Sequence, residues 1–325
     1  MNLRSNLILP PWTRRAVAHG RLAGTNLALL VFLGAIWGTA FPFITIGLRS
    51  MTPVLFAALR FDIAGLAILS IALFRRADMW PRERKQWAAI LIAAVLNVGC
   101  YHAFLFWGQQ FTSEVIASVI VGLNPILTTV ISRWLLTDER VGWGGVVGLG
   151  LGFLGIIALA VFKGGDSLFD ARGLGELAVV AAILSWATGS ILVRKTKHGM
   201  DVFAFTAWQM LVGAVLLHGS ALTLEHGGHV AWTAAGIVAL LYLALVSSAL
   251  GFIVYFTIME RVGPIRANLV SHIAPIFAAI VGTLVLHEGI EPRALLAFAL
   301  IVSGFGLVAR PAPQPPAGGG ALVSR

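Results

Sequence analysis

The sequence predicts an all-α membrane protein in which ten transmembrane helices form two inverted five-helix repeats. Two observations predict this fold: long apolar runs, and a residue pattern that recurs after roughly 150 positions. Hydrophobic residues make up 58% of the 325 residues and charged residues only 11%, which excludes an ordinary soluble domain. Because a helix needs about 20 apolar residues to cross the hydrocarbon core of a bilayer, each long apolar run is a candidate span.

Ten stretches of the chain meet this length requirement and carry few charges. The expected spans are residues 26–48, 53–74, 87–110, 114–133, 142–162, 174–194, 202–224, 232–256, 265–286 and 292–309. The predicted organisation is a cytoplasmic tail (1–25), a first repeat (26–162), a periplasmic linker (163–173), a second repeat (174–310) and a disordered tail (311–325). The segments between spans are too short to hold a separate soluble domain.

The repetition is clearest at two residue types. Trp37 in LGAIWGTAF recurs as Trp186 in AAILSWATG, and Pro125 in VGLNPILTTV recurs as Pro275 in VSHIAPIFAAI. Each copy contains five spans, and this odd number turns the second copy upside down in the membrane. Inverted repeats around a site near the membrane midplane are typical of secondary transporters.

The net charge of +9 reflects topology and does not indicate nucleic-acid binding. Most of the 23 lysines and arginines fall in the segments that would face the cytoplasm if the amino terminus did. This distribution follows the positive-inside rule. We therefore expect a multi-pass protein of a bacterial inner membrane with both termini in the cytoplasm.

Two motifs resemble chemical sites without their usual context. GLGLGFLG contains G-x-G-x-x-G, but it lies inside an apolar span, where Gly144, Gly148 and Gly152 favour close helix packing over nucleotide binding. HGGH at His226 and His229 lies in a loop, where histidines are usually solvated. We expect no metal, no cofactor and no enzymatic activity.

Ionisable residues at membrane depth are costly and indicate either a partner or a transport pathway. Arg60 and Asp62 both lie in the second span, and residues two apart point about 200° apart on a helix. We expect Asp62 to pair with a neighbouring helix, and for Arg60 a structural role and substrate contact are equally compatible with the sequence. Gln209 takes the place of Arg60 in the second copy, so the halves differ chemically there.

Several aromatic residues lie at mid-membrane depth. Trp37 and Trp186 are 11 to 12 residues into their spans, far from the interfacial belt that tryptophan prefers. We expect both to line a wet cavity, since a buried indole N–H needs an acceptor. Tyr101 and His102 belong to the most polar stretch of the third span, and we expect them to face substrate as well.

The matched prolines are candidate hinges. Pro125 and Pro275 lie near the middle of the fourth and ninth spans, where each removes a backbone hydrogen bond and should kink its helix. Kinks at equivalent positions of two inverted copies would provide one bending point for each side of the membrane.

These features together resemble the EamA branch of the drug/metabolite transporter superfamily. The resemblance rests on WGTAF, the pair Arg60–Phe61, the mid-span prolines, and the segments LLTDERVGWGG and LVLHEGIEPRA, and it covers residues 26–310. It implies a ten-helix inner-membrane carrier with a central cavity lined by spans 1, 3, 4, 6, 8 and 9. It also implies that Asp138, Glu139 and Glu288 lie at helix ends with structural roles. Within this branch the aromatic residues at mid-depth are most similar to those of aromatic amino-acid exporters.

We therefore expect a monomeric exporter of small metabolites, with aromatic amino acids as substrates, that works by alternating access. Its partners would be an amino-acid-like small molecule and the lipid bilayer, with no nucleic acid. The expected substrate-binding residues are Trp37, Arg60, Tyr101, His102, Trp186 and Gln209, with Pro125 and Pro275 as hinges. Export of other neutral or cationic molecules, drugs included, and a channel-like pathway are the alternatives. The sequence leaves the energy coupling open.

Overall fold

The computed structural model describes residues 24–75, 78–135, 171–286 and 292–308, with isolated residues between 144 and 155. Within these ranges the regular secondary structure is helical apart from an isolated β-bridge between Met51 and Val230, and turns and short irregular segments join the helices. Eight described helical stretches are long and apolar enough to cross a membrane. The terminal tails and most of the expected fifth span and linker lie outside the described residues, as do Asp138, Glu139 and Glu288. The count of ten helices therefore stays a prediction.

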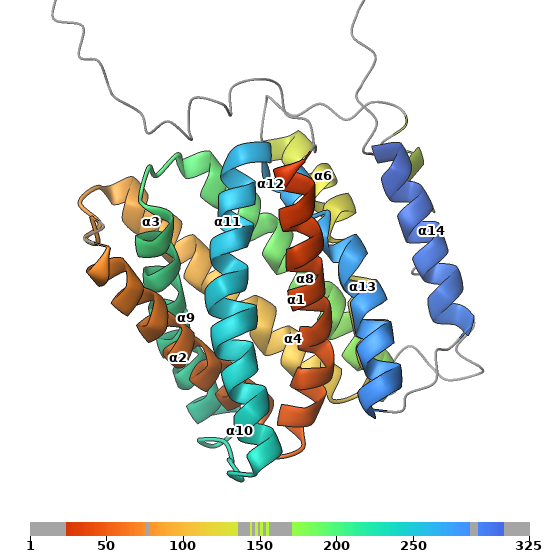
Figure 1. Cartoon of the computed structure of the whole chain (residues 1–325), viewed down its shortest axis with the longest axis horizontal. Helices are drawn as coiled ribbons and strands as arrows, with labels where there is room; N and C mark the ends of the chain where they lie inside the picture. The colour runs from red at the N-terminus through yellow and green to blue at the C-terminus, as the bar shows by residue number, and fades with distance from the viewer. Residues whose placement is uncertain are drawn as a thin grey trace, which may run out of the picture.

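The first repeat contains four described spans, and some of them are built from several helices (Figure 1). They are α1 (Thr25–Leu48), α2 (Pro53–Phe74), the third span α3 (Arg84–Ile92), η1 (Ala93–Cys100) and α4 (Tyr101–Gln109), and the fourth span α5 (Glu114–Val121) and α6 (Asn124–Leu135). The two η segments in the third spans, η1 here and η2 below, are π-helical.

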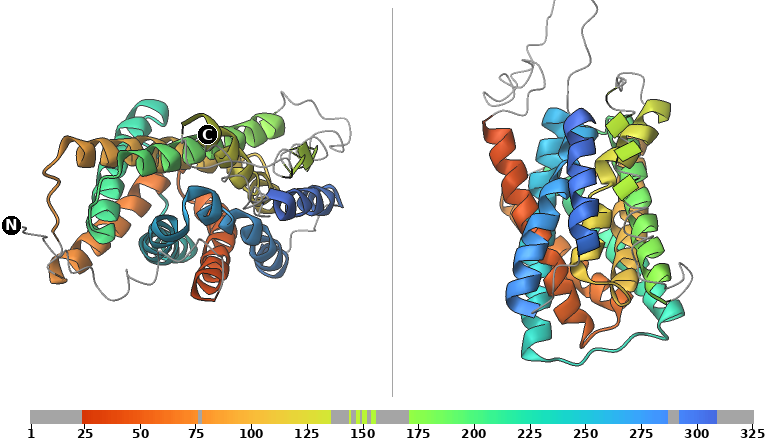
Figure 2. Two further views of the ribbon diagram at one scale, coloured as in Figure 1. Left: turned by 90° about the horizontal axis from the view of Figure 1, so that it is seen from above. Right: turned by 90° about the vertical axis from the view of Figure 1, so that its right-hand side faces the viewer.

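The second repeat follows the same plan. It contains α8 (Ala171–Thr196), α9 (Val202–Leu224), the third span α10 (Ala234–Leu241), η2 (Tyr242–Leu250) and α11 (Gly251–Val262), the fourth span α12 (Pro264–Ala267), α13 (Val270–Val281) and π-helical η3 (Gly282–Leu286), and finally α14 (Pro292–Val308). The helices run roughly along one common direction, as a membrane bundle requires (Figure 2).

Capping side chains fix the starts of some helices, α9 and α10 among them. The Asp201 carboxylate accepts hydrogen bonds from the backbone N–H groups of Phe203 (2.9 Å) and Ala204 (3.2 Å) at the start of α9. The Thr233 hydroxyl accepts from Gly236 at the start of α10. Such caps satisfy N–H groups that the first helical turn leaves unpaired.

The contacts between α2 and α9 show that the second repeat is inverted relative to the first. Glu225, which follows α9, accepts hydrogen bonds from Val54 (2.7 Å) and Leu55 (3.0 Å) at the start of α2. At the other end of the pair, the guanidinium carbon of Arg75, which follows α2, lies 4.5 Å from the ring centre of Phe203 at the start of α9. The second helices of the two repeats are thus antiparallel.

Equivalent helices of the two repeats make equivalent contacts with the opposite repeat, as a two-fold relation requires. Helix α1 packs on α13, and its counterpart α8 packs on α5 and α6. Helix α2 packs on η2, and its counterpart α9 packs on η1. Each repeat therefore completes its core with helices of the other.

Most of the described basic residues gather at one end of the bundle, the upper end in Figure 1, which we call the basic end. It is formed by the start of α1, the segments between α2 and α3, between α8 and α9, and around α12. The residues concerned are Arg75, Arg82, Arg84, Lys85, Arg194, Lys195, Lys197, Arg261 and Arg266. The opposite end contains Arg49, the turn before α5, and the β-bridge.

Asp62 pairs with a neighbouring helix, as predicted. Its Oδ2 atom lies 2.7 Å from Nε2 of His218 in α9. The contact adds a polar tie to the interface between α2 and α9. It also occupies the carboxylate, so Asp62 is directed away from Arg60.

Glycines allow several helices to approach closely, which matters because helices in lipid gain little from burying apolar surface against each other. A methyl group on Gly108 would lie 2.6 Å from the carbonyl oxygen of Gly175, and one on Gly175 would lie 2.7 Å from that of Gly108. Helices α4 and α8 therefore touch backbone to backbone here.

Replacing Gly175 by valine should destabilise the bundle by about 1–3 kcal/mol, because the backbone of Gly108 cannot move aside as a side chain could. The matched control is Gly219→Val in α9, where an added methyl group meets nothing within 4 Å. Thermal unfolding of the purified proteins should show a lower midpoint for Gly175→Val alone. Equal midpoints for the two variants would contradict this packing.

Candidate functional site

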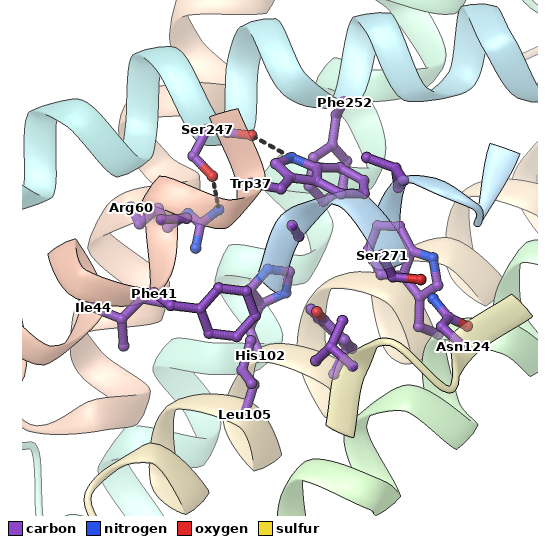
Figure 3. A pocket seen from close by; sticks show the side chains of 16 residues that line it. Trp37, Phe41, Ile44, Arg60, His102, Leu105, Asn124, Ser247, Phe252 and Ser271 are labelled. Atoms are coloured by element: carbon purple, nitrogen blue, oxygen red, sulfur yellow. Dashed lines mark hydrogen bonds between the residues drawn. The ribbon is translucent and has the colours of Figure 1, made fainter. Parts of the chain in front are cut away.

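A cavity of about 50 Å³ lies at the centre of the bundle (Figure 3). Its aromatic lining is Trp37, Phe41, Tyr101, His102, Trp186 and Phe252; its polar lining is Arg60, Asn124, Ser247 and Ser271; the rest is Ala40, Ile44, Leu105, Val121, Val270 and Ala274. These residues come from spans 1, 3, 4, 6, 8 and 9, as the family resemblance implies, and also from span 2 through Arg60. The volume has room for a few water molecules, each of which needs about 10–15 Å³.

The tryptophans of the two repeats meet in the cavity wall. The rings of Trp37 and Trp186 are 5.5 Å apart and nearly perpendicular (89°). The ring centre of Trp186 also lies 4.9 Å from that of Tyr101 and 5.5 Å from that of Phe252. These separations suit the edge-to-face contacts that aromatic rings prefer. We call Trp37, Tyr101, Trp186 and Phe252 the aromatic cluster.

The π-helical segments lie at equivalent places in the two third spans, Ala93–Cys100 and Tyr242–Leu250. Such segments are frequent at functional sites, because the wider turn redirects backbone and side-chain groups. The indole Nε1 of Trp37 donates to the carbonyl oxygen of Ser247 in η2 (3.0 Å). The acceptor that a mid-membrane indole needs is thus supplied by the other repeat.

Arg60 reaches the cavity from α2, with only 3% of its surface exposed. Its Nε donates to the hydroxyl of Ser248 (2.5 Å) and its Nη2 to that of Ser247 (3.1 Å). The guanidinium carbon lies 5.2 Å from the ring centre of Phe61 and 5.7 Å from that of Phe106. Hydroxyl oxygens and aromatic faces both stabilise a buried cation.

His102 is held in one orientation by the backbone of its own helix. Its Nδ1 lies 3.0 Å from the carbonyl oxygen of Val98. Because a carbonyl can only accept, Nδ1 carries the hydrogen, and Nε2 of a neutral ring is left as an acceptor. The ring is also packed 4.5 Å from Phe61 and 4.7 Å from Tyr101.

A hydrogen-bond network centred on Asn268 lies between the cavity and the basic end. Oδ1 of Asn268 accepts from Nε1 of Trp186 (3.1 Å) and from the hydroxyl of Tyr255 (2.8 Å). Nδ2 of Asn268 donates to the hydroxyl of Thr128 (2.7 Å), and Tyr255 also bonds Ser190 (2.9 Å). We call these five residues the Asn268 network. It joins α6, α8 and α11 to the segment between α12 and α13.

Both spans that contain the matched prolines are interrupted on the N-terminal side of the proline. In the fourth span the helix is interrupted at Gly122–Leu123, and Pro125 is the second residue of the new helix α6. In the ninth span the interruption is at Asn268–Leu269, and Pro275 lies inside α13. Proline is tolerated in the first turn of a helix because the N–H of that position would have no partner there. Pro125 therefore fits the start of α6, after the interruption at Gly122–Leu123.

Five of the six predicted binding residues, Trp37, Arg60, Tyr101, His102 and Trp186, meet in this cavity. Gln209 does not line it.

The inverted symmetry explains why Gln209 lies outside this cavity. Gly213, one turn further on the same face of α9, lies against Val98 in η1, so this face packs on the third span of the first repeat. The cavity lies on the side of Arg60, where η2 faces α2. Gln209 is instead fully buried between helices.

The sequence reasoning missed Asn124, Phe252 and Ser271 in the cavity lining and Asn268 beside it. For Asn124 a signal existed, since it directly precedes Pro125. Asn268 directly follows the short helix α12, and its partners lie far away in the sequence.

The sequence profile of the EamA-like transporter family matches residues 25–161 and again residues 173–310. The chain belongs to the EamA-like transporter family. The two matches show that it contains two EamA repeats, and together they cover most of the chain.

Relatives in distant bacteria agree with this assignment. The chain is 31% identical over 291 residues to the uncharacterized transporter YvbV of Bacillus subtilis (strain 168), covering 89% of this chain and 93% of YvbV. It is 28% identical to the uncharacterized inner membrane transporter YedA of Escherichia coli (strain K12), covering 88% of this chain and 90% of YedA. EamA relatives are thus transporters, and this chain is a multi-pass membrane protein of the same family.

The fold is also similar to that of a protein solved by crystallography, with a TM-score of 0.67 over 86% of this chain and 95% of the other. The two sequences are 21% identical, so this likeness concerns the fold alone.

Replacing Asn268 by alanine should lower stability by about 1–3 kcal/mol, because the buried N–H and O–H groups of Trp186 and Tyr255 lose an acceptor. The control is Thr188→Ala in α8, where an exposed hydroxyl bonds only its own helix. Thermal unfolding in detergent should separate the two variants clearly. An Asn268→Ala protein as stable as Thr188→Ala would show that the network does not hold the helices together.

Proposed function

We propose that this protein is a secondary transporter of a bacterial inner membrane that exports aromatic amino acids by alternating access. The observation that supports this most is the aromatic cluster, which lines a cavity at the centre of two inverted repeats. Secondary transporters bind their substrates at such a position, between repeats near the bilayer midplane.

The cavity wall suits a flat aromatic side chain. Small-molecule sites are lined mainly by apolar and aromatic residues, with a few polar groups that fix orientation. At about 50 Å³ the cavity is too small for an aromatic amino acid while the rings of the cluster contact one another. Substrate would therefore enter by separating Trp37 from Trp186 and replacing their edge-to-face contact with its own ring.

Backbone oxygens on the wall can receive an ammonium group. Val121 is the last residue of α5, so its carbonyl oxygen has no partner within that helix, and Pro275 has no N–H to give to the carbonyl oxygen of Ser271, four residues earlier. Both Val121 and Ser271 line the cavity. An unpaired carbonyl at membrane depth needs a donor, and the ammonium group of an amino acid is a suitable one.

Alternating access would use the interruptions of the fourth and ninth spans together with the prolines. With the termini in the cytoplasm, the basic end is the cytoplasmic one. The Asn268 network then closes the cytoplasmic side, and its release would open the cavity to the cytoplasm. We propose that Pro125 and Pro275 allow α6 and α13 to bend during this exchange, and that one chain suffices for transport.

The cavity lining argues against cationic drugs as the main cargo. It contains Arg60 and, among the described residues, no acidic side chain. A cation would be repelled by Arg60 and would find no counter-charge. A phosphorylated substrate is also disfavoured, because recognition of phosphate generally involves more than one cationic side chain.

Counterflow in liposomes that contain the purified protein tests this proposal. Liposomes loaded with unlabelled L-tryptophan should accumulate labelled L-tryptophan transiently, and the initial rate should saturate with concentration. Linear flux without accumulation would indicate a channel, and the absence of any flux of aromatic amino acids would refute the proposed substrate.

Trp186→Ala should raise the half-saturating tryptophan concentration about 10-fold, since it removes a ring worth roughly 1.4 kcal/mol of contact with the substrate. Trp186→Phe keeps a ring but loses the hydrogen bond to Asn268, so it separates stacking from the network. Trp232→Ala, which removes an exposed tryptophan outside the cavity, is the control. Unchanged transport by Trp186→Ala would exclude the aromatic cluster as the binding site.

Pro275→Ala should slow counterflow several-fold and also weaken tryptophan binding, because alanine offers an N–H to the Ser271 carbonyl, which stiffens α13 and occupies an acceptor proposed for the ammonium group. Pro42→Ala in α1 makes the same change in a helix without a matched proline and should transport normally. Turnover and binding are measured separately, by counterflow and by ligand-induced thermal stabilisation. Normal turnover of Pro275→Ala would exclude Pro275 as a hinge.

A further inference from the structure

Arg60 is a buried cation in a largely apolar wall. A charged side chain at membrane depth costs at least a few kcal/mol unless it is paired or solvated. The ion pairs Arg82–Asp78, Lys85–Glu83 and His218–Asp62 do not involve Arg60, which has no carboxylate partner among the described residues.

The hydrogen bonds of Arg60 are also incomplete. A guanidinium has five N–H donors in a planar fork. One on Nε and one on Nη2 are directed to Ser248 and Ser247, which leaves three without an acceptor among the described residues. The faces of Phe61 and Phe106 favour the charge but do not accept these bonds in the plane of the fork.

The two serines hold the guanidinium at the edge of the cavity. Ser247 accepts from Arg60 at its hydroxyl and from Trp37 at its carbonyl oxygen, so one residue of η2 positions both the cation and an indole of the wall. Figure 3 shows Arg60 on one side of the cavity and Ser271 with Asn124 on the other, with Trp37, Phe252 and His102 around the space between.

We propose that Arg60 is the carboxylate-binding subsite of this cavity and selects substrates that carry one negative charge. This inference rests on the proposed function and names the group that the substrate must have. A carboxylate supplies two coplanar oxygens that match the free edge of a guanidinium. It also supplies the negative charge that Arg60 lacks among its contacts with the described residues.

The number of cationic side chains in the cavity wall indicates how much negative charge a ligand can carry. Arg60 is the one lysine or arginine among the residues that line the described cavity. A single guanidinium neutralises a carboxylate and leaves a phosphate dianion with excess charge. The ammonium of an amino acid then lies at the Val121 and Ser271 carbonyls, across the cavity from Arg60.

Four compounds that share an indole ring test the subsite by competition against labelled L-tryptophan in the counterflow assay. L-Tryptophan and indole-3-propionate have a carboxylate, whereas tryptophan methyl ester and tryptamine have none. We expect the first two to compete at least 10-fold better than the last two. Equal competition by all four would overturn the proposal.

Substitutions assign the preference to Arg60. Arg60→Gln should weaken the binding of tryptophan about 10- to 100-fold, as expected for the loss of a charge-assisted hydrogen bond. The binding of the methyl ester and of tryptamine should not change. Arg60→Lys keeps the positive charge but not the planar guanidinium, so it should bind tryptophan more tightly than Arg60→Gln and less tightly than the unmodified protein. Arg75→Gln removes a cation from the same helix outside the cavity and should keep the full preference. A preference that survives Arg60→Gln would overturn the assignment.

Thermal stabilisation of the detergent-purified protein separates this inference from the proposed function, because it needs no transport. If no indole compound is transported, aromatic amino acids are the wrong substrate, and benzoate and pentanoate are then compared with their amides. Stabilisation by the acids above the amides, lost in Arg60→Gln, would support the carboxylate subsite. Acids that stabilise no more than their amides would overturn it.

Discussion

The constraint on which this structure depends is that a polar group in the middle of a bilayer must find its partner inside the bundle. Ser247 illustrates how the two repeats meet it, since this residue of the second repeat accepts hydrogen bonds from both Trp37 and Arg60 of the first. Asn268, also of the second repeat, accepts from Trp186 and Tyr255 of its own repeat and donates to Thr128 of the first. Polar side chains at depth therefore join the repeats, and the cavity lies between the two sets of bonds.

The duplication builds the scaffold, and the differences between the copies give the cavity its chemistry. Trp37 and Trp186 occupy equivalent positions and form one aromatic wall. Arg60 and Gln209 also occupy equivalent positions, yet one lines the cavity as a cation and the other is fully buried away from it. The amide atoms of Gln209 have no hydrogen-bond partner among the described residues, so η1 of the first copy, on which α9 packs, offers Gln209 no equivalent of the Ser247–Ser248 pair. The proposed selectivity for charge therefore rests on Arg60 alone.

The sequence predicted most of this arrangement, because hydropathy fixes the spans and an odd number of spans fixes the inversion. It also placed the two tryptophans in the cavity, since their depth excluded the usual interfacial role. Gln209 lies outside the described cavity because equivalent positions in inverted copies face different third spans. The interruptions at Gly122–Leu123 and Asn268–Leu269 were missed because proline was taken as the marker of each bend. The Asn268 network could not be predicted, since its members are brought together only by helix packing.

The central claim is that the aromatic cluster and Arg60 together bind one amphipathic anion-bearing molecule between the repeats. An experimental density map of the protein with saturating L-tryptophan tests this most directly. The claim predicts an indole in contact with Trp37 and Trp186 and a carboxylate within hydrogen-bonding distance of the Arg60 guanidinium. Tryptophan bound outside this cavity, or bound with its carboxylate turned away from Arg60, would contradict it.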